Sequence, residues 1–137
     1  MRKIGKSLAV LAAAVALPLT LSGTAEASIP FGKEIKGKAT YYDDSGYGAC
    51  GTRINADREM LVAVPAAYWT TSNPNKDPLC KNVSVEVTYK GKTIKVPVKD
   101  QCPSCDSKHI DLSRAAFARL ADTDLGRIDV TWKFVRS

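Results

Sequence analysis

Three segments of this chain alternate apolar and polar residues with a period of two, over residues 83–89, 93–99 and 128–134. Such alternation indicates β-strands with one face in a core and the other in solvent. Lys90-Gly91-Lys92 lies between the first two segments and predicts a hairpin. The residues that face inward in this interpretation are Val83, Val85, Val87, Tyr89, Ile94, Val96, Val98, Ile128, Val130, Trp132 and Phe134.

Shorter segments predict the remaining elements. Ser113 is a typical helix N-cap, and the residues after it place Ala116, Phe117 and Leu120 on one buried face. Several short strands with one or two short helices predict a mainly-β domain, a small barrel that is closed or nearly so, because closure removes exposed strand edges. The other expected elements are a strand over 38–42, a loop over 43–48, a buried strand over 60–64 stopped by Pro65, a helical turn over 66–69 and a polar loop over 70–78.

The first 27 residues have the pattern of a secretory signal peptide. Three basic residues precede an apolar run over 8–21, and Ala25-Glu26-Ala27 follows as a small-residue cleavage site. The alternative is a membrane anchor, but Pro18 interrupts the apolar run well short of the ~20 residues that a spanning helix needs. We therefore expect an extracellular protein, free of the membrane after cleavage before Ser28.

The charge of the exported part is mildly basic. The whole chain has 20 basic and 14 acidic side chains, of which the first 27 residues hold three and one, so residues 28–137 carry a net charge of +4. Such an excess fits nucleic acid, an anionic cell wall or a solvated surface. The lysines are scattered singly, without interleaved stacking aromatics, and this pattern argues against nucleic-acid binding.

Four cysteines, Cys50, Cys80, Cys102 and Cys105, lie after the predicted cleavage site. An even number in an exported chain indicates two disulfides, for which three connectivities exist. We favour Cys50–Cys80 with Cys102–Cys105. The first pairing closes a long loop and removes unfolded-state freedom, and the second makes a tight turn rigid.

The Cys-x-x-Cys sequence also raises redox and zinc alternatives. Asp106 follows Cys105 directly and would raise thiol pKa values, which disfavours a redox dithiol. His109 is the only histidine and adds just a third zinc ligand, so we expect no metal and no cofactor. We expect His109 itself at the surface or in a turn.

Six short motifs follow one another along residues 37–135: Gly37-x-Ala39-Thr40-Tyr41-Tyr42, Ala49-Cys50-Gly51, Leu61-Val62-Ala63-Val64, Val96-x-Val98-x-Asp100-x-Cys102-Pro103-x-Cys105, Ile110-Asp111-Leu112-Ser113-x-x-Ala116-Phe117 and Gly126-Arg127-Ile128-x-Val130-x-Trp132. In this order they resemble the double-psi β-barrel superfamily, which includes expansins, barwin and rare lipoprotein A. The resemblance implies a six-stranded double-psi β-barrel over residues 37–137. We expect residues 28–36 to form an exposed, partly mobile arm ahead of it.

Lytic transglycosylase relatives in this superfamily cleave peptidoglycan. Their acidic groove, by the resemblance, combines an Asp at the position of Asp100 with a Glu in the loop after the first strand and a His at the end of the second. Here the loop 52–56 holds no acid, and Pro65 stands in place of the histidine. Without a partner carboxylate the general acid is missing, so we expect no glycoside cleavage.

Expansin-like relatives loosen polysaccharides without hydrolysis, and the resemblance places their groove at Thr40, Asp100 and Asp111. Two positions depart from that pattern, because Tyr42 replaces a groove threonine and Cys102 replaces a groove tyrosine. We also expect no second carbohydrate-binding domain in this chain. Each carboxylate has a structural alternative. Asp111 can accept hydrogen bonds from the first turn of the following helix or from the neighbouring loop, and Asp100 can stabilise the turn beside Cys102.

Other relatives are secreted double-psi barrels that inhibit papain-like cysteine proteases. The start Ser28-Ile29-Pro30, the four cysteines and the length after cleavage resemble them. The resemblance implies a monomeric protease inhibitor that has no catalytic activity. We expect the apolar segment Ile29-Pro30-Phe31-Gly32 to enter the protease cleft, with Trp69 as a second contact. The alternatives are a terminus without function and a Trp69 that is partly buried over the barrel.

The same resemblance implies crosslinking by transglutaminases. Gln101 is the only glutamine in the chain, so it is the only candidate acyl donor, although its place between Asp100 and Cys102 can hide it. Lys33 and Lys36 on the predicted arm are the more accessible acceptors.

Overall fold

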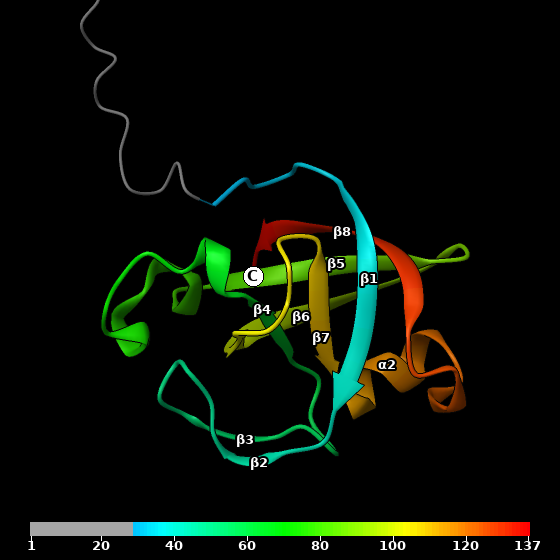
Figure 1. Cartoon of the computed structure of the whole chain (residues 1–137), viewed down its shortest axis with the longest axis horizontal. Helices are drawn as coiled ribbons and strands as arrows, with labels where there is room; N and C mark the ends of the chain where they lie inside the picture. Colours follow the sequence, from blue (N-terminus) through cyan, green and yellow to red (C-terminus); the bar gives the residue numbers. More distant parts are fainter. Residues whose placement is uncertain (1–28) are drawn as a thin grey trace, which may run out of the picture.

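The computed structural model describes residues 29–137 (Figure 1). The predicted signal peptide over residues 1–27 and Ser28 lie outside the described residues. Within the described part, no helix combines the length and the apolar character needed to cross a membrane.

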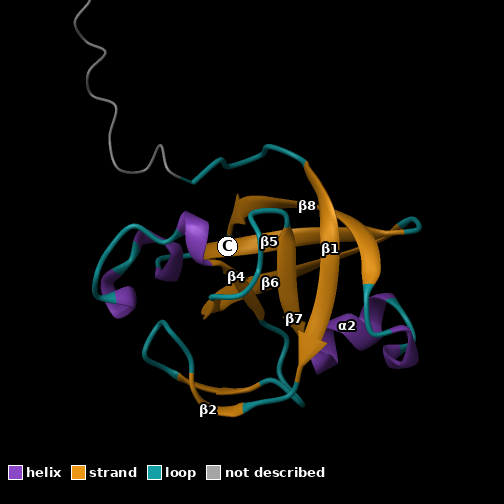
Figure 2. Cartoon of the chain, viewed as in Figure 1, coloured by secondary structure: helices purple, strands orange, loops and turns teal. Residues whose placement is uncertain are grey.

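Six strands close into a barrel in the order β1-β7-β4-β6-β5-β8. β1 pairs with β7 and β4 pairs with β6 in parallel, and the other four pairings are antiparallel. The mainly-β, six-stranded barrel predicted above is therefore confirmed, and Figure 2 shows the strands around a shared interior with one α-helix at the side. The strands are β1 Ile35–Tyr42, β4 Val62–Pro65, β5 Val83–Tyr89, β6 Lys92–Cys102, β7 His109–Ser113 and β8 Ile128–Arg136.

The three alternating segments form the antiparallel side of the barrel. β5 lies between β6 and β8, with Val85 opposite Val96 on one neighbour and Phe134 on the other. All three of these side chains are fully buried. The predicted hairpin turn is confirmed at Lys90 and Gly91, which both have positive φ, as a type I′ turn requires.

Within residues 29–137 there is one α-helix, α2 Arg114–Leu120, and it packs against the barrel. Ser113 caps it as predicted, because its hydroxyl accepts the Ala116 N–H at 3.1 Å. Ala116, Phe117 and Leu120 are the buried face. The remaining helical turns are the 3₁₀ elements η4 Ala66–Tyr68, η5 Pro74–Lys76, η6 Pro78–Cys80 and η7 Thr123–Leu125.

Three short strands differ from the sequence expectation. The predicted loop over 43–48 contains β2 Ser45–Tyr47, which pairs with β3 Arg53–Asn55 in a ribbon beside the barrel (Figure 1). β7 was not predicted from periodicity, because its inward residues, Ile110 and Leu112, are only two and adjoin a helix cap. Pro65 closes β4 as its last residue, opposite Cys102.

The N-terminal segment is docked, which corrects the expected exposed arm over 28–36. Ile29 is only 5% exposed and belongs to the main core. Phe31 forms a β-bridge with Phe134, and Gly32 donates its N–H to the Phe134 carbonyl at 2.9 Å. The physical reason is that Ile29 and Phe31 gain more by packing against the main core than by remaining in solvent.

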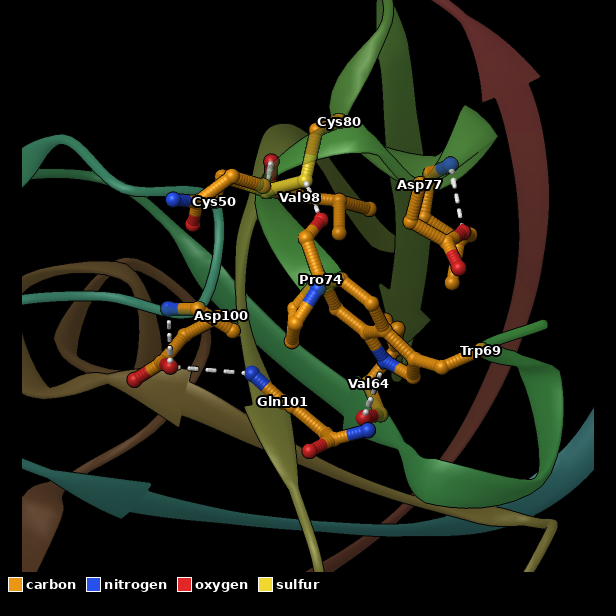
Figure 3. The surroundings of a disulfide bond; sticks show 12 residues. Cys50, Val64, Trp69, Pro74, Asp77, Cys80, Val98, Asp100 and Gln101 are labelled. Carbon is orange, nitrogen blue, oxygen red and sulfur yellow. Dashed lines mark hydrogen bonds between the residues drawn. A yellow bond between two sulfur atoms is a disulfide. The ribbon is translucent and has the colours of Figure 1, made fainter. Parts of the chain in front are cut away.

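Both predicted disulfides are present, Cys50–Cys80 and Cys102–Cys105, with Cα–Cα distances of 5.6 and 5.4 Å. Cys50 lies in the turn after β2 and Cys80 in η6, so their bond ties the ribbon side of the molecule to the 70–80 loop (Figure 3). None of the cysteines in the described residues is free.

Asp77 organises the loop that this disulfide anchors. Its side chain accepts N–H groups from Thr70, Thr71 and Leu79 at 2.8 to 3.0 Å, together with the Thr71 hydroxyl. Burial alone would raise the pKa of the Asp77 carboxyl, but these hydrogen bonds outweigh it and lower the pKa below its usual value. Asp77 is therefore a buried carboxylate with a structural role.

Candidate functional site

The pairing of β1, β7, β4 and β6 places Thr40, Asp111 and Asp100 in one row across the outside of the sheet. Thr40 is opposite Asp111, Asp111 is opposite Ala63, and Ala63 is opposite Asp100. The structure thus brings together the three polar residues that the sequence singled out. We call Thr40, His109, Asp111, Asp100 and Tyr42 the polar row.

Thr40 connects the two polar residues of β7. Its hydroxyl donates to Asp111 Oδ1 at 3.0 Å and lies 2.8 Å from His109 Nε2. A hydroxyl has one proton, so when Thr40 donates to Asp111 it accepts from His109, which then carries its proton on Nε2. Burial raises the pKa of the Asp111 carboxyl, and the Thr40 hydrogen bond offsets only part of that increase.

Asp100 fixes the neighbouring loop. Its Oδ1 accepts the N–H groups of Ala49 and Gln101, both at 2.9 Å, and its Oδ2 accepts the Tyr42 hydroxyl at 2.9 Å. Burial raises the pKa of Tyr42 far above its usual value, and the nearby Asp100 charge raises it further. Tyr42 therefore stays a neutral donor, and Asp100 holds the 49–51 turn against β6 (Figure 3).

The geometry defines the setting of both polar residues of β7. Of the two settings expected for His109, surface or turn, the structure shows the first: the side chain is half-buried on the outward face of β7, because the inward positions of that strand are Ile110 and Leu112. The signal that identifies it is its position two residues before Asp111, on the same face of a strand. Asp111 bonds to Thr40, and its carboxylate makes no hydrogen bond to the first turn of α2 in the described structure.

The segment 52–59 contributes no carboxylate to this row. The loop 52–56 contains no acid, and the two acids that follow it are engaged elsewhere. Asp57 pairs with Arg114 at 2.9 Å, and Glu59 accepts the Asn55 N–H at 3.0 Å. The row offers two carboxylates, a hydroxyl and an imidazole to a hydroxyl-rich ligand, and the Asp44 charge lies close enough to act on Asp111 and Tyr42.

A second candidate surface lies at the docked N-terminal segment. Pro30, Tyr68 and Ser107 line one open hollow of about 430 Å³, together with Lys33, Glu34, Ile35, Lys36 and Lys108. The Tyr68 hydroxyl donates to the Ser107 carbonyl at 2.8 Å, which joins η4 to the 102–108 loop. Pro30 and Tyr68 of η4 thus line the same hollow, while Phe31 and Gly32 are held against Phe134 of β8.

Trp69, the other predicted protease contact, is half-buried. Its indole N–H donates to the Val64 carbonyl at 3.3 Å, and its ring packs against the main core. Figure 3 shows Trp69 and Gln101 in the surroundings of the Cys50–Cys80 disulfide. Gln101 is also half-buried, whereas the other predicted crosslinking residues, Lys33 and Lys36, are exposed.

A closed six-stranded barrel with two parallel pairings and this polar row defines a double-psi β-barrel protein. The family model described as "Lytic transglycolase" matches residues 34–132, and the chain belongs to this double-psi β-barrel family.

Comparison with individual proteins refines this placement. The chain is 61% identical over 129 residues to the papain inhibitor of Streptomyces mobaraensis, a match that covers 93% of this chain and 90% of that protein. The solved structure of the Streptomyces papain inhibitor superposes with a TM-score of 0.78 at 65% identity, covering 79% of this chain and 99% of that one. A variant of the Clavibacter michiganensis expansin in complex with cellohexaose gives a TM-score of 0.62 at 31% identity, over 76% of this chain and 51% of that one.

Proposed function

We propose that this protein is a secreted inhibitor of papain-like cysteine proteases that acts by occupying the active-site cleft. The observation that carries the proposal is the 61% identity to a papain inhibitor over 93% of the chain. The barrel and both disulfides supply a rigid scaffold, and a rigid surface loses little conformational entropy when it binds.

The inhibitor acts without catalysis of its own. The segment 52–59 adds no carboxylate to the polar row. Asp57 is paired with Arg114, and Glu59 accepts the backbone N–H of Asn55. Pro65 occupies the position expected for the catalytic histidine and is buried in β4. Purified protein should therefore release no soluble fragments from peptidoglycan, and measurable turnover would contradict this part of the proposal.

The protease meets the surface formed by Pro30, Phe31 and Gly32, with Trp69 as a second contact. Ile29 supports this surface from below, because it is buried in the core and cannot enter a cleft while the segment stays docked. Phe31 lies under the Arg136 guanidinium, 4.1 Å from ring centroid to Cζ, which holds the ring in place. The segment therefore acts as a fixed turn and not as a flexible arm.

A papain titration tests the main function. Protein comprising residues 28–137 is mixed with active-site-titrated papain, and residual activity is followed on a small fluorogenic substrate. We expect a stoichiometric, saturable loss of papain activity. Full papain activity in the presence of a tenfold excess would overturn the proposal.

Two variants test the contact surface. Phe31→Ala and Trp69→Ala should each weaken papain inhibition by roughly 30-fold, the value of a ~2 kcal/mol aromatic anchor. Tyr47→Ala is the matched control, since Tyr47 is an aromatic residue that is 71% exposed on the β2–β3 ribbon. Thermal melts of all three variants separate lost contact from lost folding.

A second candidate function rests on the polar row. Thr40, Asp100 and Asp111 are assembled as the expansin-like resemblance implies, and an expansin structure with cellohexaose shares this fold. We propose weak, non-hydrolytic binding of cell-wall polysaccharide at this row as the alternative. Retention on insoluble peptidoglycan, chitin or cellulose without papain inhibition would favour it, and the reverse result would favour the inhibitor.

Crosslinking by transglutaminase is a further proposed modification. Lys33 and Lys36 are exposed acceptors. Gln101 is half-buried, and its backbone N–H donates to the Asp100 carboxylate. Transglutaminase should therefore attach a labelled glutamine peptide to this protein far faster than a labelled amine. Mass spectrometry of the product locates the modified residues, and rapid amine incorporation at Gln101 would contradict the assignment.

A further inference from the structure

The outer face of β1 changes character along its length. Its outward residues are Lys36 and Lys38 in the first half and Thr40 and Tyr42 in the second, because alternate residues of a strand share a face. The second half belongs to the polar row. The first half lies among three open hollows that do not include the polar row.

These hollows adjoin because they share lining residues. Two of them share Lys36, Gly37 and Lys38, and two share Lys36, Ser107 and Lys108. Their volumes are about 390 to 430 Å³ each. We call these three adjoining hollows, which together extend from Lys33 past Lys36 to Lys90, the basic trough.

The basic trough holds most of the net positive charge of the molecule. Its six basic residues outnumber its three acidic residues, an excess of three, where residues 28–137 as a whole have an excess of four. Asp129 is already paired with Lys38, and Asp106 accepts the Lys108 N–H at 2.9 Å. The basic residues are Lys33, Lys36, Lys38, Lys90, Lys108 and Arg127, and the acidic residues are Glu34, Asp106 and Asp129.

The backbone beneath the trough is held in place before any ligand arrives. The Lys108 carbonyl accepts the Lys38 N–H at 3.3 Å and the Trp132 indole N–H at 3.0 Å. Gly37 passes so close that a side chain there would collide with the Lys108 carbonyl. β1 and the 106–108 turn are therefore locked together, and Lys36 and Lys108 project from fixed positions.

We propose that the basic trough binds a linear phosphate polymer. A compact anion contacts one hollow, whereas a chain of repeating charges reaches lysines in all three and gains from each. Five of the six cations are lysines, compact charges that suit phosphate without requiring a bidentate geometry. Nucleic acid fits less well, because the ring of Tyr68 at one end packs against Trp132 and Phe134 and does not serve as a free stacking platform.

Fluorescence anisotropy with end-labelled inorganic polyphosphate tests this proposal. The trough variant carries Lys36→Glu, Lys108→Glu and Arg127→Glu. The matched control carries Lys76→Glu, Lys81→Glu and Arg58→Glu, three exposed residues outside the trough with the same change of charge. The trough variant should bind polyphosphate roughly tenfold or more weaker and show a reduced salt dependence, while the control stays within about threefold of the parent.

Three other outcomes would overturn the proposal. Equal losses in both variants would show attraction by net charge alone. Competition by orthophosphate at equal total phosphate would show a compact-anion site, and tighter binding of an oligothymidylate of equal charge would show a nucleic-acid site. If the glutamate variant fails to fold, the set Lys36→Gln, Lys108→Gln and Arg127→Gln gives the same comparison.

Discussion

Gly37 shows how a single residue without a side chain controls the packing of two elements. A Cβ at this position would collide with the Lys108 carbonyl, which is rigid backbone and cannot move away cheaply. Gly37→Ala should therefore lower the free energy of unfolding by about 3 kcal/mol, as overpacking does. Gly126→Ala is the control, because Gly126 has positive φ but open space around it and should cost only about 1 kcal/mol. Urea unfolding measures the free energy of unfolding of both variants. Equal losses would contradict a close approach of Gly37 to the Lys108 carbonyl.

Asp77 has a pH dependence that follows from its lowered pKa. A carboxyl whose pKa is lower in the folded state contributes stability above its unfolded value of 3.8, and loses it as the pH falls through the folded value. Asp77→Asn should therefore cost about 2 kcal/mol at pH 7, and the difference from the parent should shrink steadily below pH 3.8. Urea melts from pH 7 to pH 2 measure this, and a difference independent of pH would contradict the charged role.

At the scale of elements, the docked N-terminal segment links stability to inhibition. Deleting residues 28–32 removes buried Ile29 and the Phe31 bridge to β8 and should cost about 3 kcal/mol of unfolding free energy. Lys33→Ala, an exposed change next to the segment, should leave stability unchanged. A truncated protein with parental stability would show that the docking contributes nothing. Papain titration of the same two proteins then reports on the contact itself.

The elements also show how far sequence patterns reach. Alternation correctly predicts β5, β6, β8 and their hairpin, because each pattern is local and has a period of two. The same reasoning missed β7 and the β2–β3 ribbon, since segments of three to five residues carry too few alternating positions. It also treated Ile29 as exposed, because burial of a terminal residue depends on a distant partner.

At the scale of the whole molecule, the two disulfides differ in what they stabilise. Cys50–Cys80 spans 30 residues and Cys102–Cys105 spans three. Loop-closure entropy predicts a loss of about 3.7 kcal/mol for Cys50→Ser with Cys80→Ser, against about 1.6 kcal/mol for Cys102→Ser with Cys105→Ser. Urea unfolding of the two double variants ranks them. A larger loss in the second pair would show that interactions of the folded 102–105 turn, and not chain entropy, dominate.

The sequence by itself determined the strands with strong alternation, the Ser113 cap and the family resemblance, because each depends on residues close together or on a motif of fixed order. For the cysteines it only favoured one of three pairings, and the structure selected that one. The family resemblance implied a shared groove for Thr40, Asp100 and Asp111. Only the tertiary structure decided that His109 joins them, that Ile29 is buried, and that Lys36 and Lys108 line the same hollows. These contacts come from strand pairings between distant segments, including the two parallel ones, and a local pattern does not specify which strand becomes its neighbour.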